Sequence, residues 1–155
     1  MIYTEATKKA LLLAFEAHDG QLDKAGVPYI CHPLHVAEQM TDEDSTVTAL
    51  LHDVAEDTET SLEDIATAGF APRILQALAL LTHDKSVPYL DYVRALAPDP
   101  LARRVKLADL RHNMDDTRLG PLDEETRRRR LAKYAPALEL LERWEKQTLE
   151  EDRLE

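Results

Sequence analysis

Apolar side chains in the middle of the chain recur at helical spacing and lead directly into chelating residues. Four of them follow the i, i+3, i+4, i+7 pattern of a buried helix face: Val47, Leu50, Leu51 and Val54. His52-Asp53 lies within this stretch, and Glu56-Asp57 follows one helical turn later. A neutral imidazole beside a carboxylate at the buried end of a helix provides half of a divalent-metal site. Because adjacent helical residues point about 100° apart, both side chains reach one ion only near a helix end or bend.

Helical spacing extends over almost the whole chain, which predicts an all-α, single-domain helical bundle. The 155 residues include only 4 glycines, and a chain of this length buries about two-thirds of its unfolded surface in one domain. Capping residues and helix-opening prolines predict helices that begin near residues 4, 33, 45, 61, 72, 88, 99 and 123. We expect residues 1–145 to form the domain and 146–155 to be a charged helix end or tail.

Composition argues against several classes of partner. The formal net charge of −11 disfavours a surface for nucleic-acid polymers. No apolar run approaches the roughly 20 residues of a membrane span, and the N-terminus has no signal-peptide pattern. Cys31 is the only cysteine, which excludes an intramolecular disulfide and fits a reducing compartment. We therefore expect a cytoplasmic protein that binds neither nucleic-acid polymers nor membranes, and the sequence leaves both a monomer and a homo-oligomer open. The basic run Arg127 to Arg130 is interpreted as a solvated helix face.

Two residues outside the central run are candidates to complete a metal site. His32 precedes a helix-opening proline, a rigid place to hold an imidazole. Asp109 is an acid in an otherwise apolar stretch, where a carboxylate is costly to bury unless it is paired or metal-bound. The alternative for Asp109 is an ion pair with Arg104 or Arg111. The resulting mixed N/O ligand set suits Mn²⁺, Fe²⁺ or Zn²⁺: His32, His52, Asp53 and Asp109. The other His-Asp pairs, at 18–19 and 83–84, are interpreted as incidental.

Three segments in this order resemble the HD-domain metal phosphohydrolases, and most of all the alarmone-hydrolase domains of the RelA/SpoT family. They are Gly26 to Pro33, Leu50 to Thr58 and Val105 to Asp109. The resemblance implies an HD-type helical bundle that uses Mn²⁺, or another divalent metal, to remove the 3′-pyrophosphate of guanosine tetra- or pentaphosphate. It also implies a metal shell made of the four candidates above.

By position, the resemblance implies that Glu56 and Asp57 activate or position the attacking water. It implies that Asn113 contacts the nucleoside, whereas the alternative for Asn113 is a helix C-cap. Lys24 is a candidate substrate-binding residue, with a solvated loop lysine as its alternative.

Two places depart from the family pattern. Asp23 stands where the family has an arginine that contacts the nucleotide, and Asp115-Asp116 follows Asn113-Met114 where the family often has Arg-Thr. Acids beside phosphates are unfavourable, so Lys24, Lys85 and Lys106 are candidate compensating cations. The sequence thus predicts a metal-dependent phosphohydrolase whose substrate is a phosphorylated nucleotide, with guanosine 3′,5′-bis(diphosphate) 3′-pyrophosphohydrolase as the first candidate. The alternatives are a nucleotide-binding regulatory module on a degenerate HD scaffold, or a structural helical protein without metal.

Overall fold

The computed structural model describes residues 1–119 and 122–154, with only the backbone described at Leu119. These residues form helices and no strand, which confirms the predicted all-α class. The helices are α1 (Glu5–Ala17), α2 (Cys31–Glu38), α3 (Glu43–Leu51), α4 (Val54–Asp57), α5 (Leu62–Thr67), α6 (Pro72–Leu81), α7 (Tyr89–Leu96), α8 (Pro100–Asn113), α9 (Asp116–Leu119) and α10 (Glu124–Asp152). Glu155, the last residue of the expected tail, lies outside the described residues.

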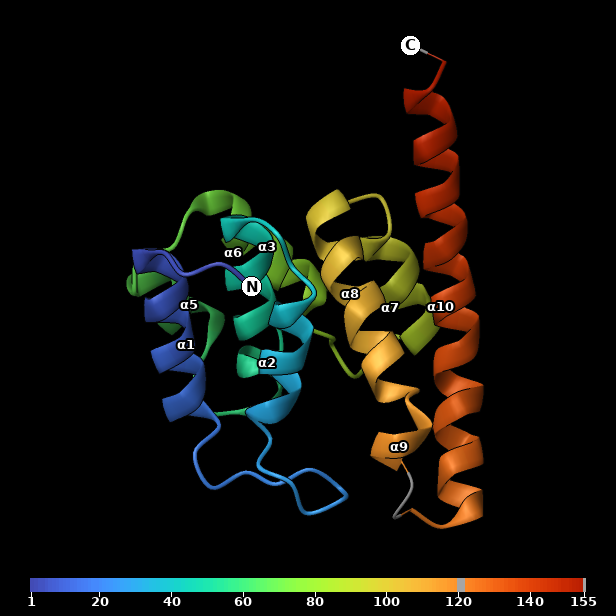
Figure 1. Cartoon of the computed structure of the whole chain (residues 1–155), viewed down its shortest axis with the longest axis horizontal. Coiled ribbons are helices and arrows are strands. Elements are labelled where there is room, and N and C mark those ends of the chain that lie inside the picture. Colours follow the sequence, from blue (N-terminus) through green and yellow to red (C-terminus); the bar gives the residue numbers. More distant parts are fainter. Residues whose placement is uncertain (120–121, 155) are drawn as a thin grey trace.

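Helix α3 lies at the centre of the bundle and packs against α1, α2, α6 and α8 (Figure 1). Every residue from Ser45 to Leu51 is buried, so α3 is enclosed on all sides rather than on the one face that its apolar stripe predicts. The buried threonine hydroxyls of α3 form hydrogen bonds with backbone carbonyl groups of the preceding turn. Thr46 and Thr48 each donate from Oγ1 to a carbonyl oxygen four residues earlier, at 2.7 Å. These hydrogen bonds satisfy the polar groups that the helix brings into the core.

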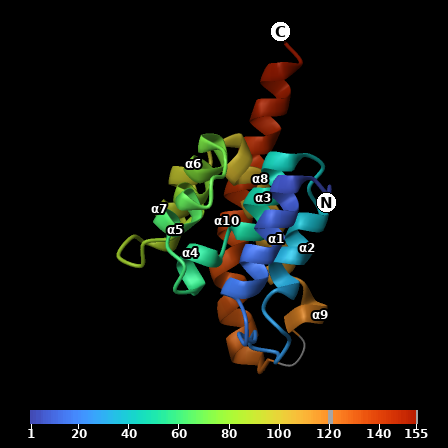
Figure 2. The ribbon, with the colours of Figure 1, turned by 90° about the vertical axis from the view of Figure 1, so that its left-hand side faces the viewer.

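Helix α10 runs along one side of the bundle and packs against α7 and α8. Its C-terminal end extends beyond the rest of the molecule in both ribbon views (Figures 1 and 2). Ala137 and Leu141 are its buried positions, and the buried Arg103 of α8 donates from Nε to Glu145 at 2.6 Å. Residues 149–154 are exposed. Packing therefore fixes α10 as far as about residue 145, and the remaining turns stand in solvent.

Most helix starts agree with the predicted caps. Asp42, Ser61, Asp99 and Asp123 each accept from the backbone N–H three residues on. The differences are local: α2 begins at Cys31, α8 continues to Asn113, and the single-turn α9 was not predicted. Among the described residues, no helix is both long enough and apolar enough to cross a lipid bilayer.

Candidate metal centre and active-site cavity

The central helix stops at the point where its two chelating residues lie. Helix α3 ends at Leu51, and α4 begins at Val54, so His52 and Asp53 occupy a bend instead of continuing the helix. Asp53 has φ −102° and ψ −3°, which turns the backbone out of helical register. The bend lets two adjacent side chains face one point. His32 from α2 and Asp109 from α8 approach the same point.

The four predicted ligands converge on one small volume. Nε2 of His32 lies 2.9 Å from Oδ1 of Asp109 and 3.4 Å from Oδ2 of Asp53. Nε2 of His52 lies 3.2 Å from Oδ2 of Asp53 and 3.6 Å from Oδ1 of Asp109. Adjacent ligands of one ion, at bonds of about 2.1 Å, are themselves about 3 Å apart. The cluster therefore has the dimensions of a divalent-metal shell.

His52 provides a direct test of whether these residues fit a metal. Its Nδ1 lies 2.6 Å from the carbonyl oxygen of Ala49, so Nδ1 carries the proton and donates it there. The Nε2 atom of His52 is buried, faces the Asp53 and Asp109 carboxylates and has no hydrogen-bond partner among the described residues. A buried polar atom without a partner is costly. A cation at the cluster satisfies this atom, so the donor set fits a divalent metal.

A second histidine orients His32. The Nδ1 atoms of His32 and His112 lie 2.7 Å apart. Burial and the neighbouring Arg118 guanidinium lower the pKa of His112 to about 3, so its imidazole is neutral. His112 can then accept the Nδ1 proton of His32, which leaves Nε2 of His32 directed at the cluster as a ligand.

The two carboxylates of the cluster are ionised. Burial opposes ionisation, but the His52 ring holds the pKa of Asp53 well below its usual range, and Lys106 does the same for Asp109. Nζ of Lys106 donates to Oδ2 of Asp109 at 2.7 Å. Asp109 thus has a buried cation as its partner, but neither arginine considered from the sequence, because Arg104 pairs with Asp42 and Arg111 with Glu142.

Glu56 and Asp57 stand beside the cluster in different environments. Glu56 accepts from the backbone N–H of His83 at 2.8 Å and from Nζ of Lys85 at 2.9 Å. Among the described residues Asp57 has no ion pair, and Lys85 only partly offsets the effects that raise its pKa. Burial, with repulsion from Asp53 and Glu56, raises the pKa of Asp57 to about 6. Asp57 can therefore exchange a proton near neutral pH.

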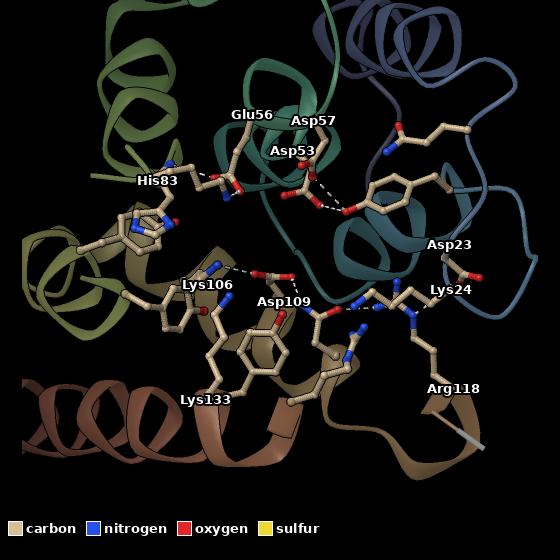
Figure 3. Close-up of a pocket in the computed structure, with 18 of the residues that line it drawn as sticks. Asp23, Lys24, Asp53, Glu56, Asp57, His83, Lys106, Asp109, Arg118 and Lys133 are labelled. Atoms are coloured by element: carbon tan, nitrogen blue, oxygen red, sulfur yellow. Dashed lines mark hydrogen bonds and ion pairs between the residues drawn. The ribbon is translucent and has the colours of Figure 1, made fainter. Parts of the chain in front are cut away.

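A cavity of about 440 Å³ opens over the cluster and is lined by Asp53, Glu56, Asp57 and Asp109. Figure 3 shows these acids between two basic ends of the cavity. Lys24 and Arg118 lie at one end, and Lys106 and Lys133 lie at the other. The arrangement provides metal ligands and a proton acceptor in the middle and cations on both sides.

Both residues predicted to bind substrate line this cavity, Lys24 from the loop after α1 and Asn113 from the end of α8. The C-cap of α8 is Met114, so Asn113 does not serve as that cap. Instead, Nδ2 of Asn113 donates to Oδ1 of Asp109 at 2.8 Å. Its Oδ1 accepts from Nη1 of Arg118 at 2.6 Å. The amide is thus fixed beside a candidate metal ligand.

The two departures from the family pattern have different outcomes. Asp23 lines the cavity, as expected. Neither Asp115 nor Asp116 lines the cavity. Asp115 instead accepts from the backbone N–H of Thr117 at 2.8 Å and starts α9, and Asp116 pairs with Arg127 at 3.0 Å.

Several lining residues were missed. Arg130 lines the cavity, which corrects the interpretation of the basic run as a wholly solvated face, and His83 also lines it. Lys133 lies over the Tyr89 and Tyr134 rings, 4.5 and 5.4 Å from their centroids. The i, i+3, i+4 spacing of Arg130, Lys133 and Tyr134 on one helix was the available sign of a shared face.

Comparisons with known proteins agree with this geometry. The HD domain family model matches residues 10–137. The bifunctional (p)ppGpp synthase/hydrolase SpoT of Escherichia coli (strain K12) is 35% identical over an alignment of 136 residues, and the match covers 79% of this chain and 19% of that protein. The Homo sapiens guanosine-3′,5′-bis(diphosphate) 3′-pyrophosphohydrolase MESH1 is 38% identical over an alignment of 105 residues, and the match covers 61% of this chain and 58% of that protein.

A solved structure, described as a metazoan ortholog of SpoT that hydrolyzes ppGpp, matches with a TM-score of 0.69 at 27% identity. The match covers 96% of this chain and 98% of that one. The chain spans only about a fifth of the length of the long relatives, 22% for the Aquifex aeolicus protein and 19% for SpoT. Since the family model covers most of the chain and all four clustered ligands, the chain belongs to the HD domain family.

Proposed function

We propose that this protein is a divalent-metal-dependent phosphohydrolase that removes pyrophosphate from the 3′ position of guanosine 3′,5′-bis(diphosphate). The observation that carries the proposal is the convergence of His32, His52, Asp53 and Asp109 beneath a cavity with basic ends. The named activities of SpoT and MESH1 support the same reaction. We propose Mn²⁺ as the metal, because the mixed imidazole and carboxylate shell without thiolate suits it and the resemblance to alarmone hydrolases implies it.

When bound, the metal supplies a water of lowered pKa and neutralises phosphate charge. The side chains do the remaining work. Asp57, with its pKa raised to about 6, accepts or steers the proton of the attacking water. Tyr29 orients this carboxylate through its hydroxyl, 3.2 Å from Oδ2 of Asp57. Glu56 is held by Lys85 and the His83 backbone, which positions it at the cavity wall.

Electrostatics of the cavity suit a polyphosphate, although the chain as a whole is acidic. Six of the lining residues are cationic and five are acidic, whereas the chain has a net charge of −11. A bound divalent ion adds two further positive charges at the centre. The cavity is thus a locally cationic site in an anionic protein, and such a site raises the local concentration of an anionic substrate.

We also propose a cytoplasmic location, which the single cysteine and the nucleotide substrate support. Residues 1–145 are proposed as the HD-type catalytic domain, with 146–155 as a charged helix end outside it. This boundary agrees with the burial of α10, whose last buried residue is Leu141.

The test is release of pyrophosphate from guanosine 3′,5′-bis(diphosphate) by the metal-loaded protein. Turnover is expected with Mn²⁺ and is expected to disappear with a chelator or with Asp53→Asn. Asp91→Asn is the matched control, because Asp91 is an exposed carboxylate paired with Arg94 outside the cavity. Tight nucleotide binding without turnover, with Mn²⁺ demonstrably bound, would contradict the proposal and favour a regulatory module.

A further inference from the structure

Arg118 reaches from α9 into the end of the cavity where Lys24 lies (Figure 3). Its side chain is only 14% exposed, which is unusual for an arginine that lines a cavity. Nη1 donates to Oδ1 of Asn113 at 2.6 Å and lies 3.0 Å from Nδ1 of His32. The guanidinium is therefore held in a defined position beside the metal cluster.

Asp23 fixes the other side of this arginine. Oδ1 of Asp23 accepts from the backbone N–H groups of Ala25 and Val27, at 2.8 and 3.0 Å, so its own loop holds the carboxylate. Oδ2 of Asp23 lies 3.8 Å from Nε of Arg118. The acid that departs from the family pattern is thus balanced by a cation from α9, and it does not present an uncompensated charge to the substrate.

Arg118 still has donors to offer. Within the described part of the chain, its contacts involve Nη1 and Nε, so the two N–H bonds of Nη2 remain for a ligand. An arginine side chain donates hydrogen bonds and cannot accept them. Arg118 consequently favours a ligand group that carries an acceptor at this position.

Cations line both ends of the cavity, but at the end that holds Arg118 the Asp23 carboxylate balances the guanidinium, so we place the phosphates at the opposite end. Lys106 and Lys133 lie at that opposite end. Lys85, also beside that end, is ion-paired with the Glu56 carboxylate. With the scissile 3′-diphosphate over the metal cluster and the 5′-diphosphate among these lysines, the base of the substrate is left for the end that holds Arg118.

We propose that Arg118 contacts the base of the nucleotide and makes the site prefer guanine to adenine, with Asp23 as the residue that positions it. This inference rests on the proposed function. Guanine offers O6 and N7 as neighbouring acceptors to an arginine. Adenine has an amino donor in place of O6, which a guanidinium meets with another donor.

The experiment compares pyrophosphate release from guanosine 3′,5′-bis(diphosphate) and its adenosine counterpart, for the parent and for Arg118→Met. The ratio of the two kcat/KM values is expected to fall on the order of tenfold. The fall is expected mainly in KM for the guanosine substrate, with Mn²⁺ affinity unchanged. Arg118→Lys, which keeps the charge and a donor, is expected to retain part of the preference. Arg111→Met is the matched control, since Arg111 pairs with Glu142 outside the cavity.

An unchanged ratio in Arg118→Met would overturn the inference. So would an equal loss on both substrates with weaker Mn²⁺ binding, because that result assigns the effect of Arg118 to its contact with His32. If the Mn²⁺-loaded parent releases no pyrophosphate, the proposed function fails, and Arg118 is judged from calorimetric binding of GDP and ADP. A reduced GDP preference in Arg118→Met then supports its role, and an unchanged preference overturns it.

Discussion

The hydroxyl of Tyr29 donates a hydrogen bond to Oδ2 of Asp53, across 2.7 Å. The same hydroxyl lies 3.2 Å from Oδ2 of Asp57, so one phenol contacts a candidate metal ligand and the candidate base. Burial raises the pKa of Asp57, and the contact with Tyr29 opposes this rise. Tyr29→Phe is therefore expected to move the acid limb of pyrophosphate release to higher pH. Rate profiles of parent and variant measure the shift, and an unmoved limb would contradict it.

The role of Asp57 predicts how activity depends on pH. Its carboxylate accepts a proton only when ionised, so the rate is expected to rise with pH and level off near its pKa of about 6. A metal bound at Asp53 favours ionisation of Asp57 and therefore moves the acid limb of the pH–rate profile to lower pH. Asp57→Asn is expected to lose activity by about a hundredfold to ten-thousandfold. Activity within a few-fold of the Asp91→Asn control would remove Asp57 from the proton-transfer step.

The same carboxyl predicts an effect on stability. Because its pKa rises from 3.8 to about 6 on folding, the folded state binds more protons in this window. The free energy of unfolding therefore falls as pH rises from about 4 to 6. Asp57→Asn removes this pH-dependent fall in the free energy of unfolding. The variant is expected to stabilise the metal-free protein at pH 7 by at most about 1 kcal/mol after solvent screening. Urea unfolding at pH 4 and pH 7 measures it, and an equal effect at both values would refute the linkage.

Metal loading is expected to stabilise the protein increasingly as pH rises. Burial opposes protonation of His52, but Asp53 and Asp109 raise its pKa well above 6.5, so a proton competes with the metal. Free Mn²⁺ at 100 times its dissociation constant adds about 2.7 kcal/mol to the free energy of unfolding. Melting temperatures with and without Mn²⁺ between pH 6 and 8 measure the trend. His52→Ala is expected to abolish it, and a response that survives in this variant would place the metal elsewhere.

The buried pair of Lys106 and Asp109 predicts a stability loss that metal partly restores. Lys106→Met leaves the Asp109 carboxylate buried without its cation and is expected to cost about 3 kcal/mol in metal-free protein. Mn²⁺ supplies positive charge at the same carboxylate, so the loss should shrink when it is bound. Denaturant unfolding measures the stability loss in the metal-free protein and in the Mn²⁺-bound protein. Arg104→Met is the control, because its exposed pair with Asp42 is worth at most about 1 kcal/mol.

Helix starts are predictable here because a cap and the N–H group it satisfies lie three residues apart, as at Asp42 and Asp99. The bend at His52-Asp53 has no glycine or proline to mark it, and the sequence indicated it only because two adjacent side chains cannot reach one ion from a regular helix. Helix α9 is a single turn started by Asp115. The sequence indicated Asp115 only as an acid near the nucleotide, and its hydrogen bond to the first turn of α9 is known only from the structure.

The metal ligands are predictable because polar side chains in apolar runs are costly unless they bind something, as Asp109 illustrates. Arg118, Arg130 and Lys133 follow the motif segments along the chain, and only the packing of α9 and α10 brings them to the cavity. No local pattern indicates that Asp23 will meet Arg118. The sign of the charge at that end of the site is thus a property of the tertiary structure.

The metal ligands and several basic residues of the cavity come from different helices, and this affects how the site can evolve. The metal ligands come from α2, α8 and the bend before α4, whereas Arg118, Arg130 and Lys133 come from α9 and α10. Under the proposed role of Arg118, mutations in α9 and α10 can therefore alter which nucleotide is accepted and leave the hydrolytic centre intact. Such a division lets descendants, or a protein engineer, exchange the substrate while inheriting the reaction.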